Sequence, residues 1–195
     1  QWRQIIARAE DAQKKGLNIR LQVAPRGIGV MLGLQCPFPP FMGYPSYKKI
    51  SQLPLAERVA HMKDPLFKAQ LLSENSEKVA GDGSSVPPLA DVLLSQINLI
   101  SRKMFILGEN PDYEQGVENS IFQMATEEHL SPLAKIYDVL LEKEGHELIY
   151  FPIYNYTEMS YEAVSEMMRH PQALLGLTDG GAHVGTICDA SFPTY

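Results

Sequence analysis

Apolar residues recur at helical spacing in several parts of the chain. Trp2, Ile5, Ile6 and Ala9 form one apolar stripe, and Gly16 stands where the C-terminal cap of such a helix belongs. The pattern therefore predicts a helix at the start of the sequence. Similar spacing predicts helices over residues 53–62, 65–74, 117–128 and 161–169, and a further helix that opens at Ser131 and Pro132.

Shorter apolar runs predict strands over residues 17–24, 148–151 and 174–177, the first of which ends at Pro25. The apolar positions of residues 92–107 fit both the helical and the strand period, so this segment has no assignment. Because helices and strands alternate, we expect an α/β fold. The last strand, helix and strand are expected to form a βαβ unit with parallel strands.

Two segments read as long loops. Residues 36–47 hold four prolines among aromatic side chains, a density that is incompatible with a regular helix or a central strand. Residues 75–88 are rich in Gly, Ser and Pro and form the clearest break in the pattern. Gly27, Gly29 and Gly33 suggest a close-packed helix or turn, and their spacing misses the dinucleotide-binding fingerprint by one residue.

The net charge and the apolar content of the sequence argue against two classes of binding partner, nucleic acids and membranes. The 195 residues carry a formal net charge of -6, which gives no basic surface for a nucleic acid or an anionic membrane. No apolar run approaches the roughly 20 residues of a membrane-spanning helix. Cys36 and Cys188 form no Cys-x-x-Cys pair and do not indicate a disulfide framework, so we expect a cytoplasmic protein.

The candidate chemistry lies near the end of the sequence. Asp179 follows the apolar run 173–177 and precedes two glycines, which is where a barrel enzyme carries a catalytic carboxylate. His183 is close enough along the chain to line the same pocket. Arg26, after the turn at Pro25, is a candidate to pair with the carboxylate of an acylated amino acid. The plainer alternatives are an Asp that accepts N–H groups in its own turn, a turn-capping His and an Arg in a surface ion pair.

Residues 154–156 end a predicted strand. Tyr154, Asn155 and Tyr156 are candidates to face a pocket at that end, but packing in the core or hydrogen bonding is the favoured role for them. Neither cysteine has an adjacent histidine that would activate a thiol nucleophile. The carboxylate of Asp179 therefore remains the principal catalytic candidate.

The segment Asp179, Gly180, Gly181, Ala182 and His183 resembles the signature of the N-acyl-D-amino-acid deacylase branch of the amidohydrolase superfamily. Four other stretches are similar to the same family and follow its order. They are residues 22–34, residues 53–58 followed by Asp64 and Pro65, residues 111–114 and residues 151–156. The resemblance thus extends over nearly the whole chain.

The resemblance implies a metal-dependent (β/α)8 barrel that hydrolyses the amide bond of N-acyl D-amino acids or similar linear amides. It implies one or two zinc ions, with Asp179 as a metal-linked carboxylate and general base, and with His183 and Arg26 as substrate-binding residues. The family's other ligands include a His-x-His pair, which none of the five histidines of this chain forms. We therefore expect those ligands upstream of Gln1.

On this interpretation residues 1–195 are a single incomplete TIM-type barrel domain, truncated at both ends, that contains only the last strand-helix units. A barrel typically needs about 250 residues. Such a fragment is expected to be inactive by itself, and its exposed strand edges favour homo-oligomers.

Two alternatives stay open. The first is a stand-alone, non-catalytic binding or regulatory module derived from the barrel, which would cover its strand edges by dimerising or with residues 36–47 and 75–88. The second is a complete enzyme of another kind that uses Asp179 and His183 as an acid–base pair.

Overall fold

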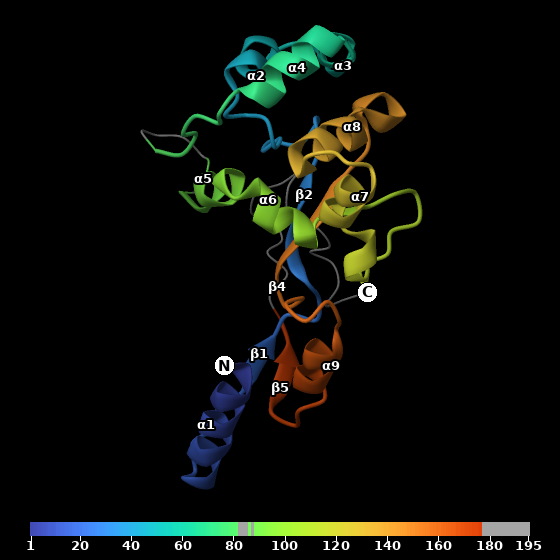
Figure 1. The fold of residues 1–195 in the computed structure, drawn as a ribbon. Coiled ribbons are helices and arrows are strands. Elements are labelled where there is room, and N and C mark those ends of the chain that lie inside the picture. The colour runs from blue at the N-terminus through green and yellow to red at the C-terminus, as the bar shows by residue number, and fades with distance from the viewer. Residues whose placement is uncertain (82–85, 87, 177–195) are drawn as a thin grey trace.

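The computed structural model describes residues 1–81, 86 and 88–176, and it shows a mixed α/β chain (Figure 1). At one end of the molecule lie α1 (Trp2–Lys14), β1 (Leu21–Val23), α9 (Glu162–Met168) and β5 (Ala173–Leu175). We call these four elements the β1–β5 unit. The strands β1 and β5 pair in parallel, although about 150 residues separate them along the chain.

A second sheet lies in the middle segment, residues 28–154. Its strands are β2 (Ile28–Leu32), β3 (Phe105–Ile106) and β4 (Ile149–Tyr154), in the order β2-β4-β3, and both pairings are antiparallel. The expected parallel βαβ unit at the end of the sequence is therefore wrong. Its first strand, β4, pairs antiparallel with β2 and β3, whereas its second strand, β5, pairs with β1.

The strand β2 contains Gly29 and lies between Gly27 and Gly33, where a close-packed helix or turn was expected. A Cβ atom on Gly29 would lie 2.6 Å from the carbonyl oxygen of Phe151 on β4. The glycine is therefore required for close approach between two strands. Because Gly29 has no side chain, the sequence suggested a closely packed helix. In the structure the same property lets β2 pair closely with β4.

The middle segment also contains helices, some of which lie beside the sheet and others beyond one end of it (Figure 1). They are α2 (Pro45–Ile50), α3 (Leu55–Met62), α4 (Pro65–Ser73), α5 (Pro88–Ser95), α6 (Ile97–Ile100), α7 (Ile121–Glu127) and α8 (Pro132–Gly145), with short 3-10 turns at Ser101–Lys103 and Val117–Asn119. The helices predicted near the start of the chain and over residues 53–62, 65–74 and 161–169 are confirmed to within a few residues. The prediction over residues 117–128 divides into a 3-10 turn and α7.

Local chemistry explains where several helices begin. The Ser131 hydroxyl accepts a hydrogen bond from the Ala134 N–H at 3.2 Å, so the predicted start of α8 at Ser131 is confirmed. Asp64 caps α4 in the same way, with a carboxylate oxygen 2.9 Å from the Leu66 nitrogen. The loop predicted over residues 36–47 ends earlier than expected, because Pro45 occupies the first turn of α2, where a proline is tolerated.

Two further segments, the loop predicted over residues 75–88 and the unassigned residues 92–107, each contain more than one kind of structure. Residues 75–81 contain neither helix nor strand, but Pro88 already belongs to α5, so the predicted loop over 75–88 is one residue too long in the part that is described. Residues 92–107 fit both periods because they contain parts of two helices as well as β3.

The sheet of the middle segment separates two groups of buried side chains. Val30, Leu32 and Phe151 face the helices and belong to the main hydrophobic core. Their neighbours Met31 and Tyr150 point to the opposite face, as alternation along a strand requires. In the main core, the Tyr137 hydroxyl of α8 donates to the carbonyl of Met62 at 2.7 Å, so α8 is fixed against α3.

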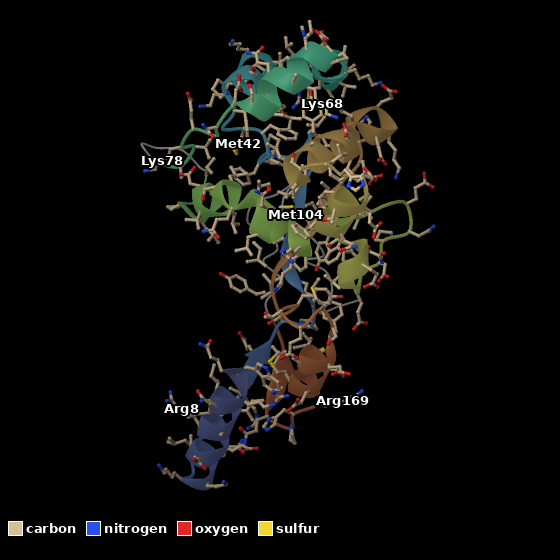
Figure 2. All side chains as sticks on the ribbon, viewed as in Figure 1. Arg8, Met42, Lys68, Lys78, Met104 and Arg169 are labelled. Carbon is tan, nitrogen blue, oxygen red and sulfur yellow. The ribbon has the colours of Figure 1, made fainter. Side chains whose placement is uncertain are left out.

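A second contact joins α8 to α4 at the edge of this core. Lys68 on α4 (Figure 2) forms an ion pair with Asp138 on α8 at 2.6 Å. Its ammonium nitrogen also lies 5.8 Å from the centre of the Tyr137 ring, within the range of a cation–π contact. Polar contacts thus join α8 to α3 and α4 at the edge of the apolar core.

Candidate functional site

The carboxyl ends of β1 and β5 lie at the same edge of their small sheet. Val23 and Leu175 are register partners, and the Gly176 N–H donates to the Val23 carbonyl at 3.0 Å. Because the strands are parallel, the chain leaves both of them on the same side. In open and closed α/β folds this edge is where ligands bind.

Arg26 is the one sequence-predicted site residue that the described part of the chain places at this edge. It follows Val23 by three residues and is only 2% exposed. Asp179 and His183 lie outside the described residues, and Asp179 follows Leu175 by four positions in the sequence. The surface position that the plainer alternative gave to Arg26 is wrong, because its side chain is buried.

The amide of Asn155 holds the backbone around Arg26. Its Nδ2 atom donates to the carbonyl oxygens of Ala24 and Arg26, at 3.3 and 3.2 Å. Asn155 itself has a φ of 61°, a left-handed conformation that asparagine tolerates better than most residues. The hydrogen-bonding role predicted for Asn155 is thus confirmed, and its effect is to fix the loop that follows β1.

Tyrosine hydroxyls approach the same loop from β4 and from the residue before α9. The Gly27 N–H donates to the Tyr161 hydroxyl at 3.3 Å, and the hydroxyls of Tyr150 and Tyr161 are 3.5 Å apart. A Cβ atom on Gly27 would lie 2.5 Å from the Tyr150 hydroxyl and 2.9 Å from the Tyr161 hydroxyl. Only glycine lets the loop pass this close to both rings.

Aromatic packing keeps these hydroxyls in place. The ring of Tyr113 meets that of Tyr150 edge-on, with centroids 5.1 Å apart, and Tyr156 packs on Tyr161 at 5.0 Å. Together with Phe105, these residues form what we call the tyrosine cluster, on the sheet face opposite the main core. The cluster joins the middle segment to the loop after β1.

The hydroxyl of Tyr156 is a hydrogen-bond donor over the whole physiological pH range. Burial, with the nearby Tyr161 hydroxyl and the carboxylate of Glu114, raises the pKa of Tyr156 to about 12. The neutral hydroxyl donates to the Gln115 carbonyl at 2.9 Å. Glu114 in turn accepts from the Tyr161 N–H at 2.9 Å, so the segment around residue 114 is tied to the start of α9.

An open hollow of about 800 Å³ adjoins the cluster along α9, between Glu114, Tyr161 and His170. The exposed carboxylate of Glu166 on this helix pairs with Arg3 of α1 at 2.6 Å, and His170 contacts Glu10 of α1 at 3.1 Å. These contacts align α1 with α9 beside the two strands. The hollow is large enough for a small molecule that reaches the carboxyl edge.

The described residues supply no metal site of their own. In residues 1–81, 86 and 88–176, no group of three or more His, Cys, Asp or Glu side chains is placed to hold a metal ion. His146 contacts Gln35, and His170 contacts Glu10, so these two histidines have different partners in different parts of the chain. The described residues therefore do not form a zinc site by themselves.

The thiol of Cys36 is a poor nucleophile in this environment. Burial raises its pKa, which keeps the sulfur protonated near neutral pH. The low weight given to a cysteine nucleophile from the sequence agrees with this.

Sequence reasoning named Arg26 and Asn155 but did not single out Tyr150 and Tyr161. The available signal was Gly27, since a glycine directly after a polar turn residue marks a place where other groups approach the backbone closely. Which groups approach could not be read from the sequence, because they follow by more than 120 residues.

The chain matches no protein-family model, no curated protein and no solved structure. In the parts of the chain that the structure describes, no helix is both long enough and apolar enough to cross a membrane.

Proposed function

We propose that this chain forms the C-terminal part of the barrel of a metal-dependent amidohydrolase that hydrolyses N-acyl D-amino acids or similar linear amides. One observation carries the proposal. The parallel pairing of β1 with β5 brings the loop of Arg26 to the edge from which the segment leading to Asp179 departs. The loop after β1 and the segment after β5 therefore leave the sheet at the edge where a barrel carries its chemistry.

The exposure of the β1–β5 unit supports the barrel interpretation. Leu174 and Leu175 of β5 are 53% and 50% exposed, yet parallel sheets are normally covered on both faces. In a complete barrel, further strands and helices would cover these side chains. The middle segment would then be an insertion between two neighbouring barrel strands.

The proposed reaction adds water across an amide bond and yields a carboxylate and an amine. Asp179 would act as general base toward the attacking water and return the proton to the leaving nitrogen. Zinc, which the resemblance implies, would have Asp179 among its ligands, and its contribution would be to polarise the attacking water.

Arg26 would pair with the free carboxylate of the substrate. A buried guanidinium binds a carboxylate more strongly than an exposed one, because water competes less for its donors. The Asn155 amide would fix the backbone of Arg26 during binding, and His183 would line the same pocket.

Kinetics on the protein encoded by the complete reading frame test this proposal. With N-acetyl-D-amino acids as substrates, Asp179→Asn should lower kcat by at least about a hundredfold, as expected for a lost general base. Arg26→Gln should mainly raise KM, because it removes a contact to the unreacting carboxylate.

Tyr154→Phe serves as a matched control, since Tyr154 is 57% exposed and is assigned no role in the proposed reaction. Activity that is unchanged in Asp179→Asn would overturn the proposal. The absence of amidohydrolase activity in the complete protein would favour the non-catalytic binding module instead.

A further inference from the structure

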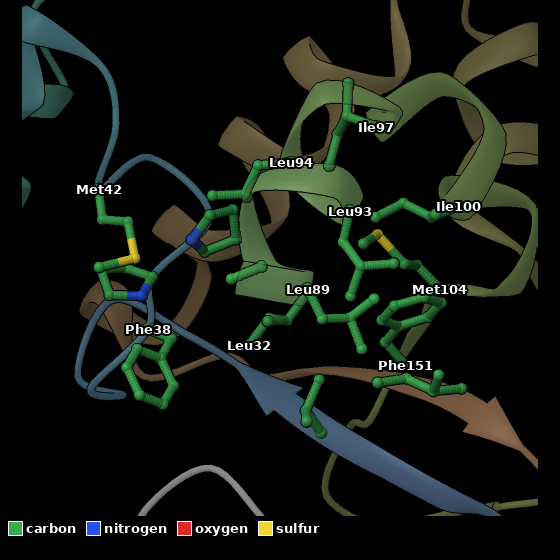
Figure 3. A pocket seen from close by; sticks show the side chains of 15 residues that line it. Leu32, Phe38, Met42, Leu89, Leu93, Leu94, Ile97, Ile100, Met104 and Phe151 are labelled. Carbon is green, nitrogen blue, oxygen red and sulfur yellow. The ribbon is translucent and has the colours of Figure 1, made fainter. Parts of the chain in front are cut away.

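An apolar cavity of about 120 Å³ lies in the middle segment, between the sheet, the helices α5 and α6, and the loop of residues 38–42 (Figure 3). All the described residues that line it are apolar, and Leu93, Ile100, Met104 and Phe151 point into it. The cavity therefore offers contact surface to a hydrocarbon group and no partner for a polar one.

Water is a poor occupant of this cavity. A buried water molecule needs about two to four polar partners, and an engineered apolar cavity of about 150 Å³ stays dry and accepts benzene. On the same scale, a cavity of 120 Å³ suits a chain of roughly five carbon atoms.

The two walls of the cavity differ in how firmly they are packed. On the sheet side, Met104 and Phe151 are 1% and 5% exposed. On the other side, α5 has no buried residue, and its Leu89 is 44% exposed. A ligand therefore enters most easily between α5 and the loop that carries Met42.

A second hollow, of about 360 Å³, adjoins the cavity. It shares Pro39 and Met42 with the cavity wall, but its lining also includes polar residues, among them Gln35, Tyr47 and Arg58. Met42 is unbranched and flexible, so a small movement of its side chain would join the two spaces. Figure 3 shows Met42 and Met104 on opposite sides of the cavity.

Arg58 gives the second hollow a positive charge. Its Nη1 atom donates to the Leu34 carbonyl at 2.6 Å and to the Tyr47 hydroxyl at 2.9 Å, whereas its Nε atom is buried without a hydrogen-bond partner. Within residues 1–81, 86 and 88–176, no carboxylate forms an ion pair with Arg58. A carboxylate is the group that complements such a guanidinium.

We propose that these two spaces together bind a short-chain carboxylic acid, with its hydrocarbon chain in the cavity and its carboxylate at Arg58. The site is independent of the proposed amide hydrolysis. Val30 and Phe151 line the cavity from one face of the sheet, whereas Tyr150 and the tyrosine cluster lie on the other face.

Methyl NMR spectra of the 195-residue chain, titrated with hexanoate and with hexan-1-ol, test the proposal. Both probes should shift the methyl signals of Ile100 and Met104 saturably. Arg58→Gln should weaken hexanoate by at least about tenfold, the usual contribution of a hydrogen bond to a charged group, and leave hexan-1-ol within about twofold.

Two substitutions on α5 separate the cavity from its surroundings. Ala90→Leu fills the cavity and should weaken both probes at least about tenfold, since the displaced chain loses its apolar contacts. Val92→Leu is the matched control, because Val92 lies on the same helix, is 52% exposed and does not line the cavity.

Xenon provides a readout that needs no carboxylate. Xenon should shift the same methyl signals in the unmodified chain and in Arg58→Gln, but not in Ala90→Leu or, if that variant does not fold, in Leu93→Phe. The absence of saturable shifts with either organic probe would overturn the proposal. Equal weakening of hexanoate and hexan-1-ol by Arg58→Gln would also overturn it, because Arg58 would then act only on the shape of the loop.

Discussion

The middle segment and the β1–β5 unit differ in how much of their apolar surface is buried. Phe41, Tyr137 and Leu140 in the middle segment are completely buried. In the β1–β5 unit, Ile5 and Leu174 are 57% and 53% exposed. The middle segment thus packs its own core, whereas the unit that positions Arg26 leaves apolar side chains available for further structure. The proposed barrel fragment with a large insertion predicts this contrast.

The largest effect is expected in the core of the middle segment. Phe41 packs between the rings of Tyr47 and Tyr137, with centroids 5.9 and 5.5 Å away. Phe41→Ala should therefore lower the free energy of unfolding by about 3–5 kcal/mol. Leu174→Ala, at an exposed position, should change it by less than about 0.5 kcal/mol.

Urea denaturation of the two variants measures this difference directly. A similar loss in both would mean that Leu174 is buried in solution, and the contrast between the two regions would be removed.

A smaller effect is expected where the two regions meet. Gly27→Ala places a methyl group 2.5 Å from the Tyr150 hydroxyl, and such overpacking costs about 1–3 kcal/mol. Tyr150→Phe removes that hydroxyl and should reduce the cost of the glycine substitution. A double-mutant cycle measured by thermal unfolding tests this, and strictly additive effects would contradict the close contact.

Loss of the N-terminal cap of α8 is expected to lower the free energy of unfolding by less than the substitution at Gly27. Ser131→Ala removes the acceptor of the Ala134 N–H and should cost about 1 kcal/mol. Ser95→Ala is the control, because the Ser95 hydroxyl is exposed and bonds only within its own helix. Equal urea midpoints for the two variants would show that α8 does not depend on its cap.

The smallest effect concerns acid stability. Burial alone would raise the pKa of Glu147, but hydrogen bonds from Lys143, Leu148 and Gly108 lower it below 4.5 overall. A lowered pKa in the folded state stabilises the protein above pH 4.5, and this stabilisation is lost as the pH falls through the folded-state pKa.

Glu147→Gln should therefore make the urea midpoint less dependent on pH below 4.5. Midpoints measured from neutral to acidic pH test this. Parallel pH profiles for the two proteins would show that the carboxylate of Glu147 has its ordinary pKa.

Features set by neighbouring residues were predictable from the sequence. The cap at Ser131, the proline at position 132 and the Asp64–Pro65 pair define helix starts through contacts that span only a few residues. The proline-dense loop was equally clear up to Tyr44. It was misjudged at Pro45, where proline begins a helix instead of excluding one.

Features that depend on distant partners were not predictable. The glycines of β2 permit either helix packing or close strand pairing, and only the presence of Phe151 on β4 decides between them. The partner of β5 is β1, which lies about 150 residues earlier, so hydrophobic periodicity carries no information about it. The sequence placed Arg26 near a strand end, but it could not identify Tyr150 and Tyr161 as neighbours of the adjacent Gly27.

The pairing of β1 with β5 is the observation on which the proposed function depends, and cysteine cross-linking tests it most directly. Gln22 and Leu174 are register partners. In a chain with Cys36 and Cys188 replaced by serine, Gln22→Cys with Leu174→Cys should cross-link rapidly on mild oxidation, since Cα atoms roughly 5 Å apart suit a disulfide. The pair Leu21→Cys with Leu175→Cys, two residues out of register, should cross-link far more slowly. Equal rates for the two pairs would contradict the parallel register, and with it the shared edge at which the loop of Arg26 begins and β5 ends.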